Sequence, residues 1–179
     1  VSDSTDGIFD CTIEPVMDAW GFTTQNYRVP SADELQQLLT HVDYKQVQQN
    51  GSDVSIPADV QVDLGGIAKG YTSDRIMQVF ADNGVTSGIV SLGGNVQALG
   101  CKPDSSKWRV AVQDPNDEGE NFAVVEIADE AVITSGGYQR YFEDNGRTYH
   151  HIIDPRTGTP ADSGVISSTI ISHDGTLAD

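Results

Sequence analysis

The sequence is poor in positive charge. Its 179 residues include 10 lysines and arginines against 27 aspartates and glutamates, which gives a formal net charge of −17 at pH 7. Such a chain repels nucleic acid and anionic membrane surfaces, so neither is expected as a partner. A solvated acidic surface would account for the charge by itself. Any ligand that carries phosphate would then need a local cation or a metal ion.

Long apolar runs and cysteines are also scarce. No run approaches the roughly 18 apolar residues that span a membrane, and residues 1–10 have neither the basic nor the apolar region of a signal peptide. The two cysteines, Cys11 and Cys101, could form a disulfide or remain thiols, and their number does not decide which. Since there is no internal repeat or low-complexity linker, we expect one domain over residues 1–179.

Two segments have the apolar spacing of helices. Residues 30–42 begin with Ser31 and Glu34 in the pattern of a capping box, and leucines follow at helical spacing. A second helix is expected from about Gly66 to Ala81, because Asn83-Gly84 provides a stop signal.

Most of the remaining chain has the alternation of β-strands. In residues 53–65 we expect a strand with Val60 and Val62 on one face, and in residues 113–121 a surface loop. Asn145-Gly146 predicts a tight hairpin. The other candidate strands are residues 87–92, 95–100, 108–114, 122–128, 131–136, 138–143, 148–154 and 165–172. Together these segments predict an α+β fold, an antiparallel-rich sheet with at least two packed helices.

The stretch "VDLGGIAKGY", residues 62–71, could bind phosphate. A strand ending at Asp63 would turn at two glycines into a helix whose first N–H groups attract anions. Lys69, one turn into that helix, would add a positive charge. The spacing is not that of a Walker A motif. An ordinary tight turn, with Asp63 as a helix cap, explains the same residues.

Two adjacent histidines occur in "TYHHIIDPRTG", residues 148–158. In a strand, Tyr149, His151 and Ile153 would share one face, and His150 would point to the other. One histidine could therefore serve as a general base, although either could be an ordinary sheet residue. The distant cysteines and the lack of a His-Glu-x-x-His motif argue against zinc.

Carboxylates that could bind a hard cation such as Mg²⁺ occur near both ends of the chain. Asp10, Glu14 and Asp18 are close together in sequence, and Asp179 is the last residue. Terminal residues are usually frayed, so Asp179 would normally be set aside.

Taken in order, six stretches resemble those of the ApbE-like flavin transferases, the FAD:protein FMN transferases. They are "GIFDCTIEPVMDAWGF", "VDLGGIAKGYTSDRI", "SLGGNVQALG", "VITSGGYQRYF", "YHHIIDPRTGTP" and "LAD". The resemblance covers nearly the whole chain and implies the ApbE-like α+β fold. It also implies that an N-terminal portion and the C-terminal end of the family's full domain are missing. A chain with these parts missing is expected to bind FAD weakly and could itself be inactive.

The reaction implied by the resemblance is Mg²⁺-dependent transfer of FMN from FAD to a Ser or Thr hydroxyl, with release of AMP. The implied partners are flavin-accepting subunits of sodium-pumping NADH:quinone oxidoreductases or Rnf-type complexes. The implied location is periplasmic or extracytoplasmic, as a membrane-anchored bacterial lipoprotein. Two alternatives stay open within flavin chemistry, an Mg²⁺-dependent FAD pyrophosphohydrolase and a flavin-binding protein without turnover. A further alternative, outside flavin chemistry, is an acidic extracellular adhesion module, which would bind no nucleotide.

The resemblance also assigns residue roles. His151 matches the catalytic histidine that deprotonates the acceptor hydroxyl. Mg²⁺ would be held by the Gly66 carbonyl and the Asp179 carboxylate. Cys11 departs from the family, which usually has Pro at this position. The positions that match FAD contacts are Ile8, Phe9, Asp10, Asp63, Lys69 and Ile153.

Overall fold

The computed structural model describes residues 1–117 and 119–179 with their side chains. The chain forms two compact units, each treated by itself below. Unit 1 contains residues 1–64 and 139–164, and unit 2 contains residues 65–138 and 165–179. Both units contain helices and antiparallel strands, so the predicted α+β class is confirmed. The single domain over residues 1–179 stays a prediction. In the described part of the chain, no helix has the length and apolarity to cross a membrane.

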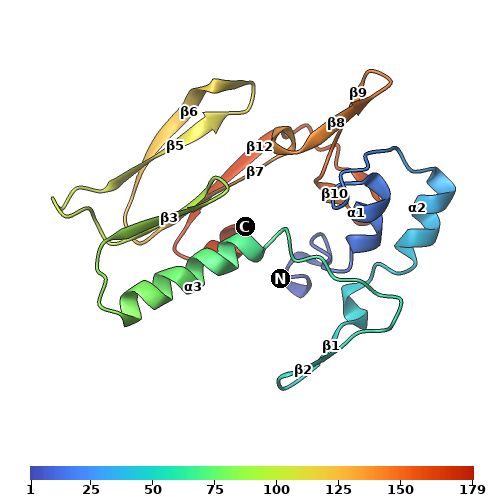
Figure 1. Ribbon diagram of the computed structural model, residues 1–179, viewed down its shortest axis with the longest axis horizontal. Helices are drawn as coiled ribbons and strands as arrows, with labels where there is room; N and C mark the ends of the chain where they lie inside the picture. Colours follow the sequence, from blue (N-terminus) through green and yellow to red (C-terminus); the bar gives the residue numbers. More distant parts are fainter. The chain divides into compact units, whose positions relative to one another are not determined.

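Unit 1 is built from short helices and two-stranded antiparallel ribbons (Figure 1). The ribbons pair β1 with β2, β8 with β9, and β10 with β11. Its elements are η1 (Asp3–Thr5), α1 (Glu14–Trp20), α2 (Ala32–Leu39), η2 (Tyr44–Gln46), β1 (Gln48–Asn50), β2 (Asp53–Ser55), β8 (Tyr141–Asp144), β9 (Arg147–His150), β10 (Ile153–Asp154) and β11 (Thr159–Pro160).

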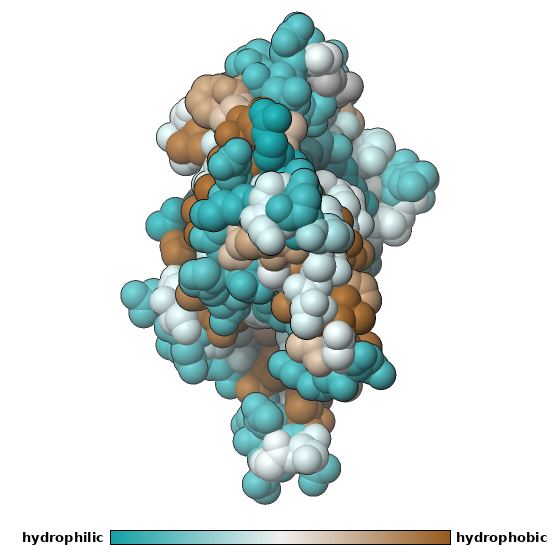
Figure 2. Space-filling view, turned by 90° about the vertical axis from the view of Figure 1, so that its left-hand side faces the viewer, coloured by the Kyte–Doolittle hydropathy of each residue, from teal (hydrophilic) through white to brown (hydrophobic). Residues whose placement is uncertain are grey.

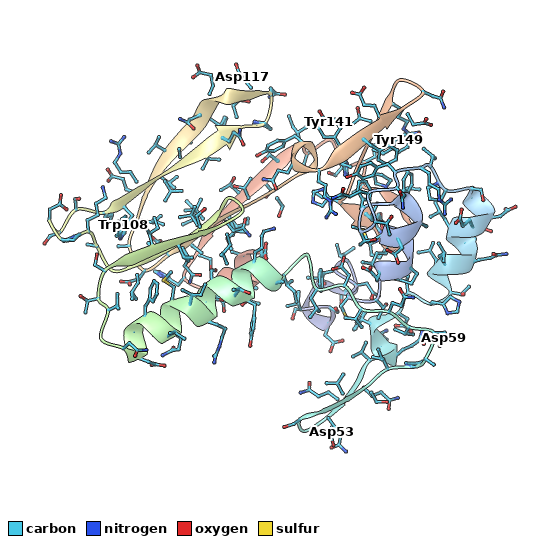
Figure 3. All side chains as sticks on the ribbon, in the orientation of Figure 1. Asp53, Asp59, Trp108, Asp117, Tyr141 and Tyr149 are labelled. Carbon is cyan, nitrogen blue, oxygen red and sulfur yellow. The ribbon has the colours of Figure 1, made fainter. Side chains whose placement is uncertain are left out.

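The core of unit 1 forms around Trp20, which is 2% exposed. Its ring lies 5.3 Å from that of Tyr149, which projects from β9 toward α1 (Figure 3). Helix α1 ends at Gly21, where φ is +81° and an added Cβ would lie 2.2 Å from the Asn26 carbonyl oxygen. Glycine is therefore required at this helix end. The buried members of this core are Val16, Met17, Trp20, Phe22 and Leu35.

The predicted helix over residues 30–42 is confirmed in its centre as α2. The Ser31 hydroxyl accepts a hydrogen bond from the Glu34 backbone N–H at 3.2 Å, which is one half of the predicted capping box. The Glu34 carboxylate pairs with Arg28, whose Nη1 lies 2.7 Å from Oε2. Glu34 is thus held both by the cap, through its backbone N–H, and by an exposed ion pair, through its carboxylate.

Unit 2 is a four-stranded antiparallel sheet with two helices. The strand order is β12-β7-β4-β3, and β5 pairs with β6 in a separate hairpin. The elements are α3 (Ala68–Asp82), β3 (Gly88–Leu92), β4 (Asn95–Leu99), β5 (Trp108–Asp114), β6 (Asp117–Ile127), β7 (Ala131–Gly136), η3 (Gly137–Gln139, which ends in unit 1), β12 (Ser167–Ser172) and α4 (Gly175–Ala178).

Helices α3 and α4 pack together and against strands of this sheet (Figure 1). Of the two helices that the sequence predicted, α3 lies here, whereas α2 belongs to unit 1 and packs against α1; α4 was not predicted. The hairpin contributes to a second core, whose buried members are Ala98, Val110, Val112, Ile127 and Val132. A smaller cluster joins α4 to β7 through Ala131, Ile133 and Ala178. The face seen in Figure 2 is largely hydrophilic with scattered apolar residues, as expected from the net charge of −17.

Two strand-level predictions were wrong. Of residues 53–65, only Asp53–Ser55 is a strand. Pro57 follows and cannot donate to a ladder, and its carbonyl accepts the Val60 N–H in a turn, which removes Val60 and Val62 from any strand face. Residues 113–121 are not a loop either, because β6 already begins at Asp117, in a pairing with β5 that contains register shifts.

The predicted hairpin at Asn145-Gly146 is confirmed. Both residues have positive φ, +49° and +76°, as a type I′ turn requires, and they connect β8 to β9. The predicted strand over residues 148–154 is interrupted, because β9 ends at His150 and β10 begins at Ile153. His151 therefore lies just beyond a strand end.

Candidate functional site

His151 is held by two hydrogen bonds, one from its backbone N–H and one from its ring. Its N–H and its ring Nδ1 both lie near the Arg140 carbonyl oxygen, at 3.1 and 3.0 Å. Because a carbonyl can only accept, Nδ1 carries the proton, and the lone pair of the neutral ring is on Nε2. The ring also contacts Phe22 edge-on, with centroids 6.3 Å apart. This is the tautomer and the restraint that a general base needs.

His150 lies in a different environment. Its Nε2 is 3.2 Å from the Ala161 carbonyl oxygen, so it donates there, and its Nδ1 is buried. Tyr149 and Ile153 pack on the unit 1 core, and His151 contacts Phe22 of that core. The two histidines therefore have different contacts, and the role of His151 as the base stays a prediction. An FAD contact by Ile153 stays a prediction.

The turn after the histidines is hydrogen-bonded to the segment GIFDCTIEPVMDAWGF, residues 7–22. The Trp20 indole N–H donates to the Gly158 carbonyl oxygen at 2.7 Å. Gly158 has φ of +69°, and an added Cβ would lie 3.4 Å from the Leu35 side chain. Asp154 accepts from the Arg156 backbone and guanidinium, and that guanidinium lowers the pKa of Asp154. The Asp-Pro-Arg-Thr-Gly stretch is thus a turn built to support α1 and α2.

Asp10 is buried at 8% exposure and organises the segment before α1. Its Oδ1 accepts from the Thr12 N–H and hydroxyl at 2.8 and 2.6 Å, and its Oδ2 accepts from the Tyr44 N–H at 3.0 Å. The same segment holds Asp63, whose N–H donates to the Cys11 carbonyl at 2.8 Å. Asp63 is therefore held next to the segment that contains Asp10. Of the other predicted FAD contacts nearby, Ile8 is 57% exposed and Phe9 is partly buried.

Glu14, at the first position of α1, has an unusual acidity. Burial, then the charges of Asp63 and Asp18, raises its pKa from 4.5 to about 7. The proton that it binds near neutral pH relieves repulsion beside Asp63. The sequence indicated Glu14 only as one of several carboxylates, because three acids spread over residues 14–63 meet only in the fold.

Replacing Glu14 with glutamine is expected to stabilise the protein in a pH-dependent way. The folded pKa is above the unfolded one, so the stability from protonated Glu14 is complete below pH 4.5 and is lost as pH rises through 7. Discounted for solvent screening, the gain at pH 8 should be about 1 kcal/mol, with little gain at pH 5. Urea unfolding at both pH values measures it, and exposed Glu143→Gln is the control. An equal gain at pH 5 would exclude charge as the cause.

In unit 2, the start of α3 carries two of the predicted residues. The N-cap is Ile67, which provides no side-chain hydrogen bond, so Asp63 does not have the cap position. Gly66 is exposed just before the helix, and Lys69 lies in its first turn, partly buried. An added Cβ on Gly93, in the β3–β4 turn, would be 4.0 Å from Lys69 Cδ. The Gly93-Gly94 turn thus lies close to Lys69.

Asp179 is held in place, contrary to what a terminal residue suggests. Its Oδ2 accepts from the Gly70 N–H at 2.8 Å, and its Oδ1 accepts from the Asn95 side-chain amide at 3.0 Å. Asp179 thereby caps the first turn of α3, where a carboxylate is favoured by the helix dipole. The sequence did not single out Asn95. The available signal was a polar residue at the start of an apolar strand.

The residues at Asp179 fit the Mg²⁺ that the family implies. Each carboxylate oxygen accepts one hydrogen bond and keeps a second lone pair for a cation. Among residues 1–117 and 119–179, no group of three His, Cys, Asp or Glu side chains could hold a metal. An Mg²⁺ here would therefore depend on one carboxylate, a carbonyl such as that of Gly66, waters and substrate oxygens, a combination that Mg²⁺ accepts.

The chain is similar to several curated FAD:protein FMN transferases. The chain is 37% identical over 195 residues to the FAD:protein FMN transferase of Treponema pallidum and 33% identical over 184 residues to that of Escherichia coli K12. These matches cover 99% and 98% of the chain and 54% and 52% of the relatives. The chain therefore spans about half the length of the curated relatives it matches.

Solved structures agree with the sequence comparison. The ApbE protein of Thermotoga maritima matches with a TM-score of 0.92 and 41% identity, over 99% of this chain and 58% of that one. The apo form of the Pseudomonas stutzeri flavinyl transferase ApbE matches with a TM-score of 0.85 and 34% identity, over 99% of this chain and 56% of that one. The sequence profile described as the ApbE family matches residues 1–179 in full. The chain belongs to the ApbE family.

Proposed function

We propose that the protein transfers FMN from FAD to a Ser or Thr hydroxyl of another protein. The observation that carries the proposal is the fixed ring of His151, with Nδ1 donating to the Arg140 carbonyl and the basic lone pair on Nε2. Several relatives that match 98% or more of the chain are FAD:protein FMN transferases by name. Both points favour a transferase over a flavin-binding protein without turnover.

The proposed reaction is a displacement at the phosphorus of the FMN half of FAD. His151 Nε2 takes the proton of the acceptor hydroxyl, and the hydroxyl oxygen forms a bond to the phosphorus of the FMN half. The P–O bond to the bridging oxygen breaks, and AMP leaves with that oxygen. A general base contributes roughly 10²–10⁴-fold, so positioning and charge neutralisation must supply the rest.

Charge neutralisation is needed because the protein itself is strongly acidic. FAD brings a pyrophosphate with about two negative charges to a chain of net charge −17. Lys69 is one source of positive charge. Asp179 and the Gly66 carbonyl would hold Mg²⁺, which when bound supplies charge neutralisation at the pyrophosphate. The roles of Ile8, Phe9, Asp10 and Asp63 as FAD contacts belong to the same proposal, with Asp10 shaping the loop that it holds.

The proposed acceptors are the flavin-carrying subunits of sodium-pumping NADH:quinone oxidoreductases or Rnf-type complexes, and the proposed location is outside the cytoplasmic membrane. Both come from the family resemblance. In a direct test, the full-length protein is incubated with FAD, Mg²⁺ and a peptide containing a Thr acceptor motif, and peptide mass and AMP are measured. We expect an FMN-sized mass gain that requires Mg²⁺. AMP and free FMN with unmodified peptide would instead indicate an FAD pyrophosphohydrolase, and absence of AMP would overturn both.

A further inference from the structure

Asn95 is a buried polar residue at the start of a strand of the sheet. It is the first residue of β4, follows the Gly93-Gly94 turn, and is 2% exposed. Buried side-chain amides are costly unless they are hydrogen-bonded. The Asn95 amide N–H donates to Asp179 Oδ1 at 3.0 Å, a contact between residues 84 positions apart.

The other carboxylate oxygen of Asp179 is held from a different element. Oδ2 accepts from the Gly70 N–H in the first turn of α3 at 2.8 Å. The sheet and the helix thus each provide one neutral donor. Two donors on two oxygens fix the plane of a carboxylate without neutralising its charge, which leaves its outer lone pairs available to a cation.

The backbone around Asp179 leaves little room for another arrangement. An added Cβ on Gly70 would lie 2.2 Å from the Gly175 carbonyl oxygen and 2.7 Å from Asp179 Cβ. Helix α4 therefore contacts the first turn of α3 backbone to backbone. This contact sets the position of the Asp179 backbone, and the Asn95 amide sets the rotation of its carboxylate.

We propose that Asn95 is a positioning residue that orients the Asp179 carboxylate for a divalent cation. The inference rests on the proposed function, in which Asp179 binds Mg²⁺. Partners that orient metal ligands typically change metal affinity by about 10–100-fold when removed. A purely structural Asn95 would affect stability but leave the affinity for the cation unchanged.

The test is a titration with Mn²⁺, as a stand-in for Mg²⁺, followed by EPR with and without FAD. Asn95→Ala should weaken Mn²⁺ binding by roughly tenfold or more, and Asn95→Ser, which perturbs the core less, should weaken it by a smaller factor. The matched control is Ser73→Ala. Ser73 is 1% exposed and donates to the Gly70 carbonyl at 2.9 Å, so its loss removes a buried hydrogen bond that does not involve Asp179.

The Mg²⁺ dependence of the transfer rate is a second measurement on the same variants. At saturating Mg²⁺, Asn95→Ser should keep kcat and KM for FAD close to those of the unaltered protein, with a higher Mg²⁺ concentration needed for half-maximal rate. Unchanged Mn²⁺ affinity in both Asn95 variants, or equal weakening in Ser73→Ala, would overturn the positioning role. Transferase activity could be absent while the Asn95 effect on Mn²⁺ persists. That result would refute the proposed function and support the role of Asn95.

Discussion

Replacing His151 with asparagine is expected to lower the rate of FMN transfer by roughly 10²–10⁴-fold with little change in FAD affinity. The amide nitrogen of asparagine can take the place of His151 Nδ1 and keep the hydrogen bond to the Arg140 carbonyl. What disappears is the basic atom at the Nε2 position. The variant therefore separates the loss of the base from a collapse of the segment. Single-turnover transfer to the acceptor peptide and FAD titration by fluorescence measure the two quantities.

His150 offers a matched control for this variant. His150 bonds through Nε2 to the Ala161 carbonyl, and the longer side chain of glutamine can place an amide N–H at that point. His150→Gln should keep the transfer rate within about threefold, because structural substitutions that keep their hydrogen bond cost little. If His151→Asn retained a rate within a few fold of the unaltered protein, the base would have to be another group.

The sequence predicted best where the signal is local. Ser31 marks the start of α2 through its side-chain cap. Gly84 after α3 and Asn145-Gly146 between β8 and β9 mark turns through positive φ angles that few residues adopt. The order of the family motifs indicated the family correctly, whereas the roles of their residues stay predictions. Trp20 and Gly158, 138 positions apart, are joined by one hydrogen bond, which gives a physical reason for two of the motifs to occur together.

The errors arose where tertiary partners decide. Val60 and Val62 alternate as in a strand, but Pro57 and the turn that follows it give Val60 a core position without a ladder. Asp179 looked like a frayed end because its partners, Gly70 and Asn95, are 109 and 84 positions away. No local pattern encodes such distances. Likewise, nothing near Glu14 in sequence indicated Asp63 as the neighbour that raises its pKa.

Unit 2 also depends on Asp74, whose main hydrogen-bond partners lie far away in sequence. Its carboxylate accepts from the Gly175 N–H at 2.8 Å, from the Thr176 N–H and hydroxyl at 2.7 Å each, and from the Gln97 amide at 2.8 Å. Burial raises the pKa of Asp74, but the hydrogen bonds from Thr176, Gln97 and Gly175 outweigh it, and the net shift is downward. These contacts tie α3 to the start of α4, the helix that leads into Asp179.

Replacing Asp74 with alanine should therefore cost about 3 kcal/mol of stability at pH 7, because several partly buried donors lose their acceptor together. Since the folded pKa is lowered, the stabilisation is present above the unfolded pKa, near 3.8, and is lost as pH falls through the folded value. The difference between the two proteins in urea unfolding should shrink below pH 4.

Asp82→Ala is the matched control, because Asp82 lies at the end of the same helix and accepts one exposed hydrogen bond, from Gln78 at 2.7 Å. It should cost no more than about 0.5 kcal/mol. The Asp74 variant should also lose Mn²⁺ affinity, because α4 is released and Asp179 with it. Equal urea midpoints for Asp74→Ala and the unaltered protein would mean that α4 is held by its apolar contacts alone, through Ala178 and Ile133.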